Sequence, residues 1–145
     1  MIMTIYLKGR NEERKPHYHV VAALVECEGE YLCMQRGKAK YEYTSFRYEF
    51  PGGKVEEGET EEDAVKRELK EEMNYEVEVV RHLTTIEHHY EDFSVTLSIH
   101  LCKAQTKEFE MREHVNFKWL KAENMASLPW VEADKEFVEK LRTFL

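Results

Sequence analysis

The sequence predicts one α/β domain in which a mixed β-sheet is flanked by helices. Short segments rich in β-branched and aromatic residues alternate with turn residues, which is the pattern of strands. Two other segments, one in the middle of the chain and one at its end, carry apolar residues at helical spacing. A chain of 145 residues suits a single domain with one sizeable core.

The first part of the chain reads as a lead-in followed by strands. Residues 1–16 are polar and contain a short β-like start at residues 3–7. The elements expected next are, in order, a mostly buried strand at 18–27, a turn at 28–30, its antiparallel partner at 31–36, a loop at 37–45 and a short strand at 47–50. Pro51 and the two glycines after it are expected to halt that last strand.

A central helix is expected to begin after Thr60. Thr60 and Asp63 form a capping box, and Val65, Leu69 and Met73 form an apolar stripe at i, i+4, i+8. The elements expected after the helix are strands at 75–90 and 94–103 paired across a turn at 91–92, a strand at 115–120, and an amphipathic helix from about residue 131 whose apolar face carries Phe137, Val138, Leu141, Phe144 and Leu145.

Charge and cysteine usage narrow the function classes. A net charge of −8 argues against a general nucleic-acid binder, because the negatively charged phosphate backbone binds to basic surfaces. The negative net charge does not exclude a phosphorylated small molecule as ligand, because cations bound at a site can make the local electrostatic potential positive. The scattered cysteines Cys27, Cys33 and Cys102 lie among apolar residues and read as reduced core thiols rather than as a disulfide framework or zinc site. With no secretory signal or membrane-length apolar run, we expect a cytoplasmic protein without a membrane partner.

The central helix concentrates carboxylates on one side. At 100° per residue, Glu68, Glu71 and Glu72 fall within an arc of about 100°, where like charges repel. A hard divalent cation such as Mg²⁺ or Mn²⁺ would relieve that repulsion, because oxygen ligands suit these ions. The alternative is a solvated acidic face in a glutamate-rich chain. That alternative is disfavoured because the full pattern from Gly53 to Glu72 has a chance probability on the order of 10⁻⁴.

The segment Gly53-x5-Glu59-x7-Arg67-Glu68-Leu69-x-Glu71-Glu72-x-Asn74-Tyr75 resembles the signature box of the Nudix hydrolases. The family usually has Gly where Asn74 stands and an aliphatic residue where Tyr75 stands. Asn is the next best residue for a left-handed C-cap, and Tyr75 can still fill an apolar site. The resemblance implies the Nudix α/β/α sandwich, with residues 1–145 forming a single domain behind the lead-in.

The resemblance also implies the chemistry, which is hydrolysis of a diphosphate linkage with Mg²⁺, or alternatively Mn²⁺. The implied metal ligands are Glu68, Glu71 and Glu72, the carbonyl of Gly52, and Glu113 from a loop. Arg67 and Glu59 are expected to hold these carboxylates in place, while Gly53 and Leu69 are structural members of the box. Ordinary helix ion pairs for Glu71 and Glu72, and an exposed loop position for Glu113, are the alternatives. The choice of general base is left open.

Weaker resemblances favour the MutT-like branch, whose members act on nucleoside triphosphates. Arg36 is expected to contact phosphate, or else to form a strand-end salt bridge. Phe50 is expected to stack on a base, or else to belong to the core. Asp134 is expected to read the base edge, or else to favour the first turn of the last helix. His88 resembles a substrate-pocket residue.

The leading hypothesis is a Mg²⁺-dependent enzyme that converts a nucleoside triphosphate, such as an oxidised (d)GTP or (d)CTP, to the monophosphate and pyrophosphate. The second hypothesis is an ADP-ribose or nucleotide-sugar pyrophosphatase. The third is a Nudix domain that binds a nucleotide as a sensor without turnover. In each case the partner is a small nucleotide rather than a nucleic-acid polymer, and the protein is a monomer or homodimer.

Overall fold

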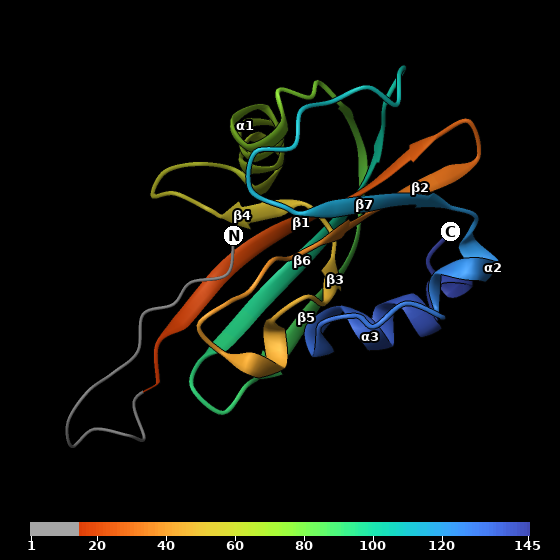
Figure 1. Ribbon diagram of the computed structural model, residues 1–145. Helices are drawn as coiled ribbons and strands as arrows, with labels where there is room; N and C mark the ends of the chain where they lie inside the picture. Colours follow the sequence, from red (N-terminus) through yellow and green to blue (C-terminus); the bar gives the residue numbers. More distant parts are fainter. Residues whose placement is uncertain (1–14) are drawn as a thin grey trace.

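The computed structural model describes residues 15–145, so the strand expected at residues 3–7 lies outside the described residues. It shows one mixed sheet between two layers of helix (Figure 1). The strands are β1 (His17–Cys27), β2 (Glu30–Gln35), β3 (Tyr48–Glu49), β4 (Gly52–Lys54), β5 (Glu78–His89), β6 (Ser94–Lys103) and β7 (Asn116–Leu120). The helices are α1 (Glu61–Met73), α2 (Ala122–Met125) and α3 (Glu132–Glu139), with 3₁₀ turns η1 (Glu42–Thr44) and η2 (Leu141–Thr143).

The sheet is built around β1, the most apolar strand. Its order is β3-β2-β1-β6-β5, and β1 runs parallel to β6 while its other pairings are antiparallel. One end of β1 pairs with β2 at Glu26 and Cys27, and its middle pairs with β4 from Val20 to Ala22. The expectation of a mixed sheet flanked by helices is therefore confirmed.

Both faces of β1 are buried, which explains its continuous apolar run. Val21, Ala23 and Val25 pack with α1 in one core cluster, whereas Val20 and Leu24 belong to a second cluster on the side of α3. Side chains alternate across a strand, so one segment contributes to both cores. The three cysteines are buried, as expected of core thiols. Among the helices at residues 15–145, none has the length and apolar content needed to cross a lipid bilayer.

The structure corrects three expectations. Strand β3 ends at Glu49, before Pro51, as expected, but the two glycines after Pro51 form a further strand, β4, which pairs with β1. The C-terminal helix ends at Glu139 and continues as the η2 turn, so Leu145 is 46% exposed rather than part of the apolar face. Strand β5 begins at Glu78, three residues later than expected, because residues 75–77 lead from the C-cap of α1 to the sheet and are not part of the strand.

Candidate active site

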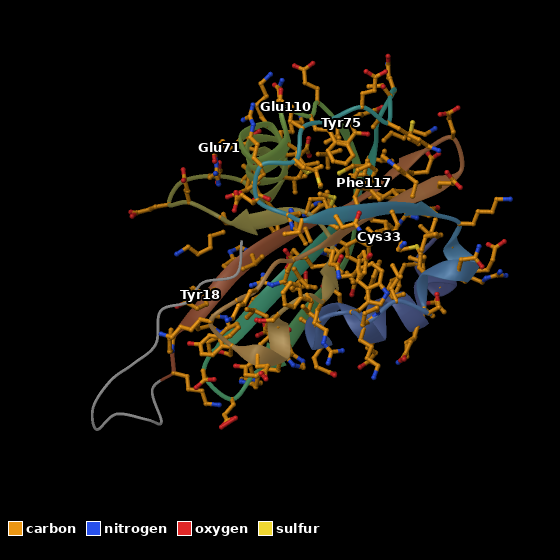
Figure 2. All side chains as sticks on the ribbon, in the orientation of Figure 1. Tyr18, Cys33, Glu71, Tyr75, Glu110 and Phe117 are labelled. Carbon is orange, nitrogen blue, oxygen red and sulfur yellow. The ribbon has the colours of Figure 1, made fainter. Side chains whose placement is uncertain are left out.

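Helix α1 is capped as its sequence predicts. The Thr60 side chain accepts a hydrogen bond from the backbone N–H of Asp63 at 3.1 Å. Asn74 takes the left-handed conformation at the C-cap, with φ of 48°, which is the geometry that Gly usually supplies. Tyr75 is 2% exposed in the core beneath α1, and its hydroxyl donates to the carbonyl of Thr106 (Figure 2). The two departures from the box therefore preserve the helix and its anchoring.

Gly53 allows α1, and Gly52 allows β1, to approach β4 closely. A Cβ atom on Gly53 would lie 2.2 Å from Cδ of Glu68, and one on Gly52 would lie 2.0 Å from the carbonyl oxygen of Val21. Any side chain at either position would displace the backbone or the carboxylate. The missing side chain of Gly53 therefore leaves room for the Glu68 carboxylate against the Gly52–Lys54 strand.

Arg67 organises the carboxylates at this end of the helix. Its Nε and Nη2 atoms donate to the two oxygens of Glu59 at 2.6 and 2.9 Å, and Nη2 also donates to the carbonyl of Lys54 at 3.0 Å. Its Nη1 atom donates to Glu68 and Glu71, each at 3.1 Å, which includes the expected i, i+4 pair. The guanidinium lowers the pKa of Glu59 to about 2. Arg67 thus ties the loop before α1 to two glutamates of the box.

Glu72 is the most unusual member of the box. It is 4% exposed, and its Oε1 atom is buried without a hydrogen-bond partner. Burial raises the pKa of Glu72, and its hydrogen bond with Glu68 and the negative charge of Glu113 raise it further. A buried carboxylate oxygen without a partner is costly unless a cation or water satisfies it.

These residues fit a hard divalent cation. Glu68 and Glu72 lie next to each other and offer oxygen donors, and Glu113 is close enough for its charge to act on Glu72. The convergence of three glutamates is only partial, because the Glu71 side chain is 61% exposed and pairs with Arg67. Within residues 15–145, no group of three His, Cys, Asp or Glu side chains is already arranged to hold a metal ion. Binding by Glu71 would therefore require its carboxylate to turn away from Arg67.

Arg36 is directed into the protein. Its Nη1 atom donates to Glu49 at 3.2 Å and its Nε atom donates to the carbonyl of Thr44 at 3.1 Å. The Arg36 side chain is 10% exposed and that of Glu49 is 2% exposed, so the pair is buried rather than at the surface. The salt-bridge alternative is thus the one that the structure displays, in a buried form.

Phe50 and Asp134 lie together in a small apolar pocket between the sheet and α3, which Tyr90, Val131 and Leu97 also line. Phe50 is 1% exposed and packs against Trp130, with ring centroids 4.8 Å apart, so it is a core aromatic whose ring reaches the pocket. Asp134 lies in the first turn of α3 and accepts a hydrogen bond from the backbone N–H of Phe50 at 3.4 Å. Burial raises the pKa of Asp134 well above its usual value, and the charge of Glu49 raises it further.

His88 borders this pocket through Tyr90. The two rings are 4.4 Å apart in an edge-to-face arrangement, and burial lowers the pKa of His88. Tyr90 is a wall of the pocket, and its hydroxyl oxygen accepts a hydrogen bond from the backbone N–H of Ala133. The structure thus brings Phe50 and Asp134 together in one pocket and places His88 beside its wall, while their roles toward a substrate stay predictions.

The sequence interpretation assigned no role to Glu49 or His114. The Nε2 atom of His114 lies 2.9 Å from Oε2 of Glu49, and both side chains are nearly inaccessible. Burial alone would raise the pKa of Glu49, but the hydrogen bond with His114 and the charge of Arg36 lower it below its usual value. The sequence signal that could have pointed to Glu49 is its position as a charged residue between two aromatic residues, Tyr48 and Phe50.

Comparisons with known proteins identify the family of this chain. The NUDIX domain profile matches residues 15–141. The chain is 32% identical over 124 residues to the CTP pyrophosphohydrolase of Escherichia coli, covering 83% of this chain and 87% of that protein. It is 46% identical over 54 residues to an 8-oxo-dGTP diphosphatase of Proteus vulgaris, and this match spans 37% of the chain and 48% of the relative.

The fold agrees as well. The crystal structure of a MutT protein from Methanosarcina mazei superposes with a TM-score of 0.79 at 21% identity, covering 89% of this chain and 95% of that one. Because the family profile spans most of the sequence and the box lies on α1 as the fold requires, the protein belongs to the Nudix family as a MutT-like hydrolase of pyrophosphate linkages.

Proposed function

We propose that this protein hydrolyses a nucleoside triphosphate to the monophosphate and pyrophosphate, with Mg²⁺ as its metal and Mn²⁺ as a possible substitute. The observation that carries the proposal is the buried carboxylate of Glu72, which lies beside Glu68 and has an oxygen without a protein partner. Two adjacent carboxylates of this kind are stable as anions only when a cation compensates them.

The metal would be held by Glu68, Glu72 and Glu71, with the Gly52 carbonyl and Glu113 as further ligands. When bound, it supplies charge neutralisation on the phosphate oxygens and acidity to a bound water. Arg67 keeps Glu68 in position through its bidentate pair with Glu59, so the carboxylate does not need to reorganise.

The pocket at Phe50 and Asp134 is proposed to receive the nucleobase, for which its present space of about 20 Å³ must widen. The raised pKa of Asp134 favours its protonated form, which can donate a hydrogen bond, while the lowered pKa of Glu49 keeps that carboxylate an acceptor. A donor and an acceptor in an apolar pocket are suited to read the edge of a base. Phe50 and Tyr90 supply aromatic surface beside them, and His88 lies behind Tyr90.

The relatives suggest two bases for this pocket. One is named a CTP pyrophosphohydrolase and the other an 8-oxo-dGTP diphosphatase, so (d)CTP and oxidised (d)GTP are both proposed substrates. The monomeric or dimeric state, the cytoplasmic location, the lack of a nucleic-acid partner and the extent of one Nudix domain over residues 1–145 stay predictions.

A panel of nucleotides with Mg²⁺ tests the proposal. Pyrophosphate and nucleoside monophosphate are quantified for the four ribo- and four deoxyribonucleoside triphosphates, for 8-oxo-dGTP and for ADP-ribose. We expect release of both products from at least one triphosphate, and the preferred one identifies the base. Absence of turnover for every triphosphate would overturn the proposal, and cleavage of ADP-ribose alone would replace it with the second hypothesis.

A further inference from the structure

The first residue of α1 joins the helix to the sheet. Glu61 is half-buried, whereas the next two residues of the helix are exposed. Its carboxylate accepts a hydrogen bond from Nε2 of His19 on β1 at 2.6 Å. It also accepts one from the hydroxyl of Ser98 at 2.9 Å and one from Nε2 of His100 at 3.1 Å, both on β6. A single carboxylate thus connects the start of the box helix to two adjacent strands.

The partners of Glu61 on β6 are themselves held in place by β5. His100 is 7% exposed, and its ring lies 5.2 Å from that of His82 in an edge-to-face arrangement. Ser98 is also buried, and its hydroxyl oxygen lies 3.0 Å from that of Thr85, which in turn lies 2.8 Å from Nε2 of His82. The carboxylate of Glu61 therefore meets donors whose positions are fixed by further contacts.

The hydrogen bonds of Glu61 are made to an ionised carboxylate. Burial alone would raise the pKa of Glu61, but the hydrogen bonds from His19, His100 and Ser98 lower it below its usual value. An ionised carboxylate only accepts hydrogen bonds, so each imidazole carries a proton on the nitrogen that faces Glu61. Hydrogen bonds of this kind are stronger than those between neutral groups.

Glu61 lies on the same face of α1 as two of the box carboxylates. Glu68 and Glu72 follow it by seven and eleven residues, so at 100° per residue the three side chains start within an arc of about 40°. Arg67 starts about 120° around the helix from Glu61 and donates to the carbonyl of Lys54 on β4. The two residues hold the helix from different sides, and together they fix its rotation about its own axis.

We infer that Glu61 is a positioning residue, whose hydrogen bonds to β1 and β6 hold the box carboxylates in the orientation that binds the metal. The inference rests on the proposed function, since it assumes that Glu68 and Glu72 are metal ligands. A misplacement on the order of 1 Å at a catalytic group can cost about 100-fold in rate. A contact two turns along the helix from Glu68 therefore affects the chemical step without touching the substrate.

The alternative is that Glu61 only stabilises α1, as an acidic residue in the first turn of a helix generally does. That role predicts a lower unfolding free energy and an unchanged kcat. Positioning predicts that kcat and metal affinity fall, while KM for the nucleotide at saturating Mg²⁺ stays the same, because only the metal-binding groups are displaced.

The test compares Glu61→Ala with Glu61→Gln and with Glu62→Ala. Glu62→Ala is the matched control, because it removes the same charge from the same turn of α1 at an exposed position. Glu61→Gln keeps the length of the side chain, and its amide can still exchange hydrogen bonds with imidazole and hydroxyl groups, which donate or accept. We measure kcat and KM with the best triphosphate of the panel, Mn²⁺ binding by calorimetry without nucleotide, and urea unfolding.

We expect Glu61→Ala to lower kcat on the order of 10-fold, to leave KM unchanged and to weaken Mn²⁺ binding by a similar factor. Glu61→Gln should retain most of both properties, and Glu62→Ala should match the wild type. Equal kcat and Mn²⁺ affinity in Glu61→Ala and the control would overturn the inference. Equal losses in Glu61→Gln and Glu61→Ala would overturn it too, because the effect would then come from charge and not from position.

A further variant decides the matter if Glu61→Ala does not fold. His19→Ala removes the shortest of the three hydrogen bonds at a position whose side chain is 46% exposed. It should lower kcat and Mn²⁺ affinity by about 3-fold, and wild-type values for both would contradict the inference. If the wild type cleaves no triphosphate, the proposed function fails, while the Mn²⁺ affinities of the variants still decide whether Glu61 positions the metal ligands.

Discussion

The two ends of the proposed substrate site are built in opposite ways. At the box, Arg67 contacts Glu59, Glu68 and Glu71, which all lie within eight positions of it, and the buried carboxylate of Glu72 follows on the same helix. At the pocket, Asp134 meets the backbone of Phe50 across 84 positions. The first arrangement follows from helix periodicity, whereas the second exists only after the sheet and α3 have come together.

The electrostatics of the two regions differ as well. The box collects like charges around one arginine and leaves Glu72 uncompensated by protein. The pocket moves the pKa values of its two buried carboxyl groups in opposite directions, because Arg36 and His114 form hydrogen bonds with Glu49, whereas burial dominates at Asp134. The comparison suggests that the box is arranged to take up a cation and that the pocket is arranged to present one donor and one acceptor.

The largest expected effect comes from removing the charge that the box leaves uncompensated. Glu72→Gln should lower kcat by about 10²–10⁴-fold, because loss of a charged ligand or base removes transition-state stabilisation. Without metal the unfolding free energy should change little, since the raised pKa of Glu72 already favours its neutral form and the amide is neutral as well. Steady-state kinetics and urea unfolding measure the two quantities. Glu62→Gln, at an exposed position of the same helix, is the matched control; a near-wild-type kcat for Glu72→Gln would contradict the ligand assignment.

The next effect concerns the stability of the pocket wall. His114→Leu removes a hydrogen-bond partner from the buried Glu49 and should lower the unfolding free energy by about 3 kcal/mol, because a buried carboxylate oxygen is left without its partner. Denaturant unfolding measures the change. Lys140→Leu breaks an exposed pair with Glu136 and should cost about 1 kcal/mol or less. Equal losses in the two variants would mean that Glu49 is better solvated than its burial indicates.

A third prediction uses the pH dependence of stability. The folded-state pKa of Asp134 is raised above its unfolded value. Below the unfolded pKa the carboxyl group is neutral in both the folded and the unfolded state and does not affect stability. Between the two pKa values it ionises only in the unfolded state, so the unfolding free energy falls as pH rises toward the folded pKa. Asp134→Asn removes that cost. The stability of the variant relative to wild type should therefore improve from pH 4 toward pH 7, as measured by urea unfolding across that range. A difference that does not vary with pH would show that Asp134 is ionised as easily as in the unfolded chain.

The smallest effect returns to the box and its departure from the usual family residue. Asn74→Gly relieves the left-handed backbone conformation but loses the hydrogen bond to Glu110, so the two changes should offset to within about 1 kcal/mol. Asn74→Ala has neither advantage and should cost about 1 kcal/mol relative to Asn74→Gly. Thermal unfolding of the two variants checks the order. A more stable Asn74→Ala would place the strain elsewhere in the C-cap.

The sequence alone determined what is local in the chain. The spacing of Glu68, Glu71 and Glu72, the caps at Thr60 and Asn74, and the apolar run of β1 identified the central helix, the mixed sheet and the Nudix box. Such features follow from helix and strand periodicity, because the interacting residues are only a few positions apart. Even so, the sequence did not reveal that Glu72 is buried while Glu71, in the expected i, i+4 pair with Arg67, stays at the surface.

Only the tertiary structure decided the contacts between distant segments. It directed Arg36 onto Glu49, joined Glu49 to His114 across 65 positions, and turned Asp134 inward toward Phe50. It also extended strand pairing beyond Pro51 into β4, because Gly52 and Gly53 permit the close contact with β1 and α1 that a side chain would prevent. These outcomes depend on how the two core clusters pack, and no short-range pattern in the sequence encodes that packing.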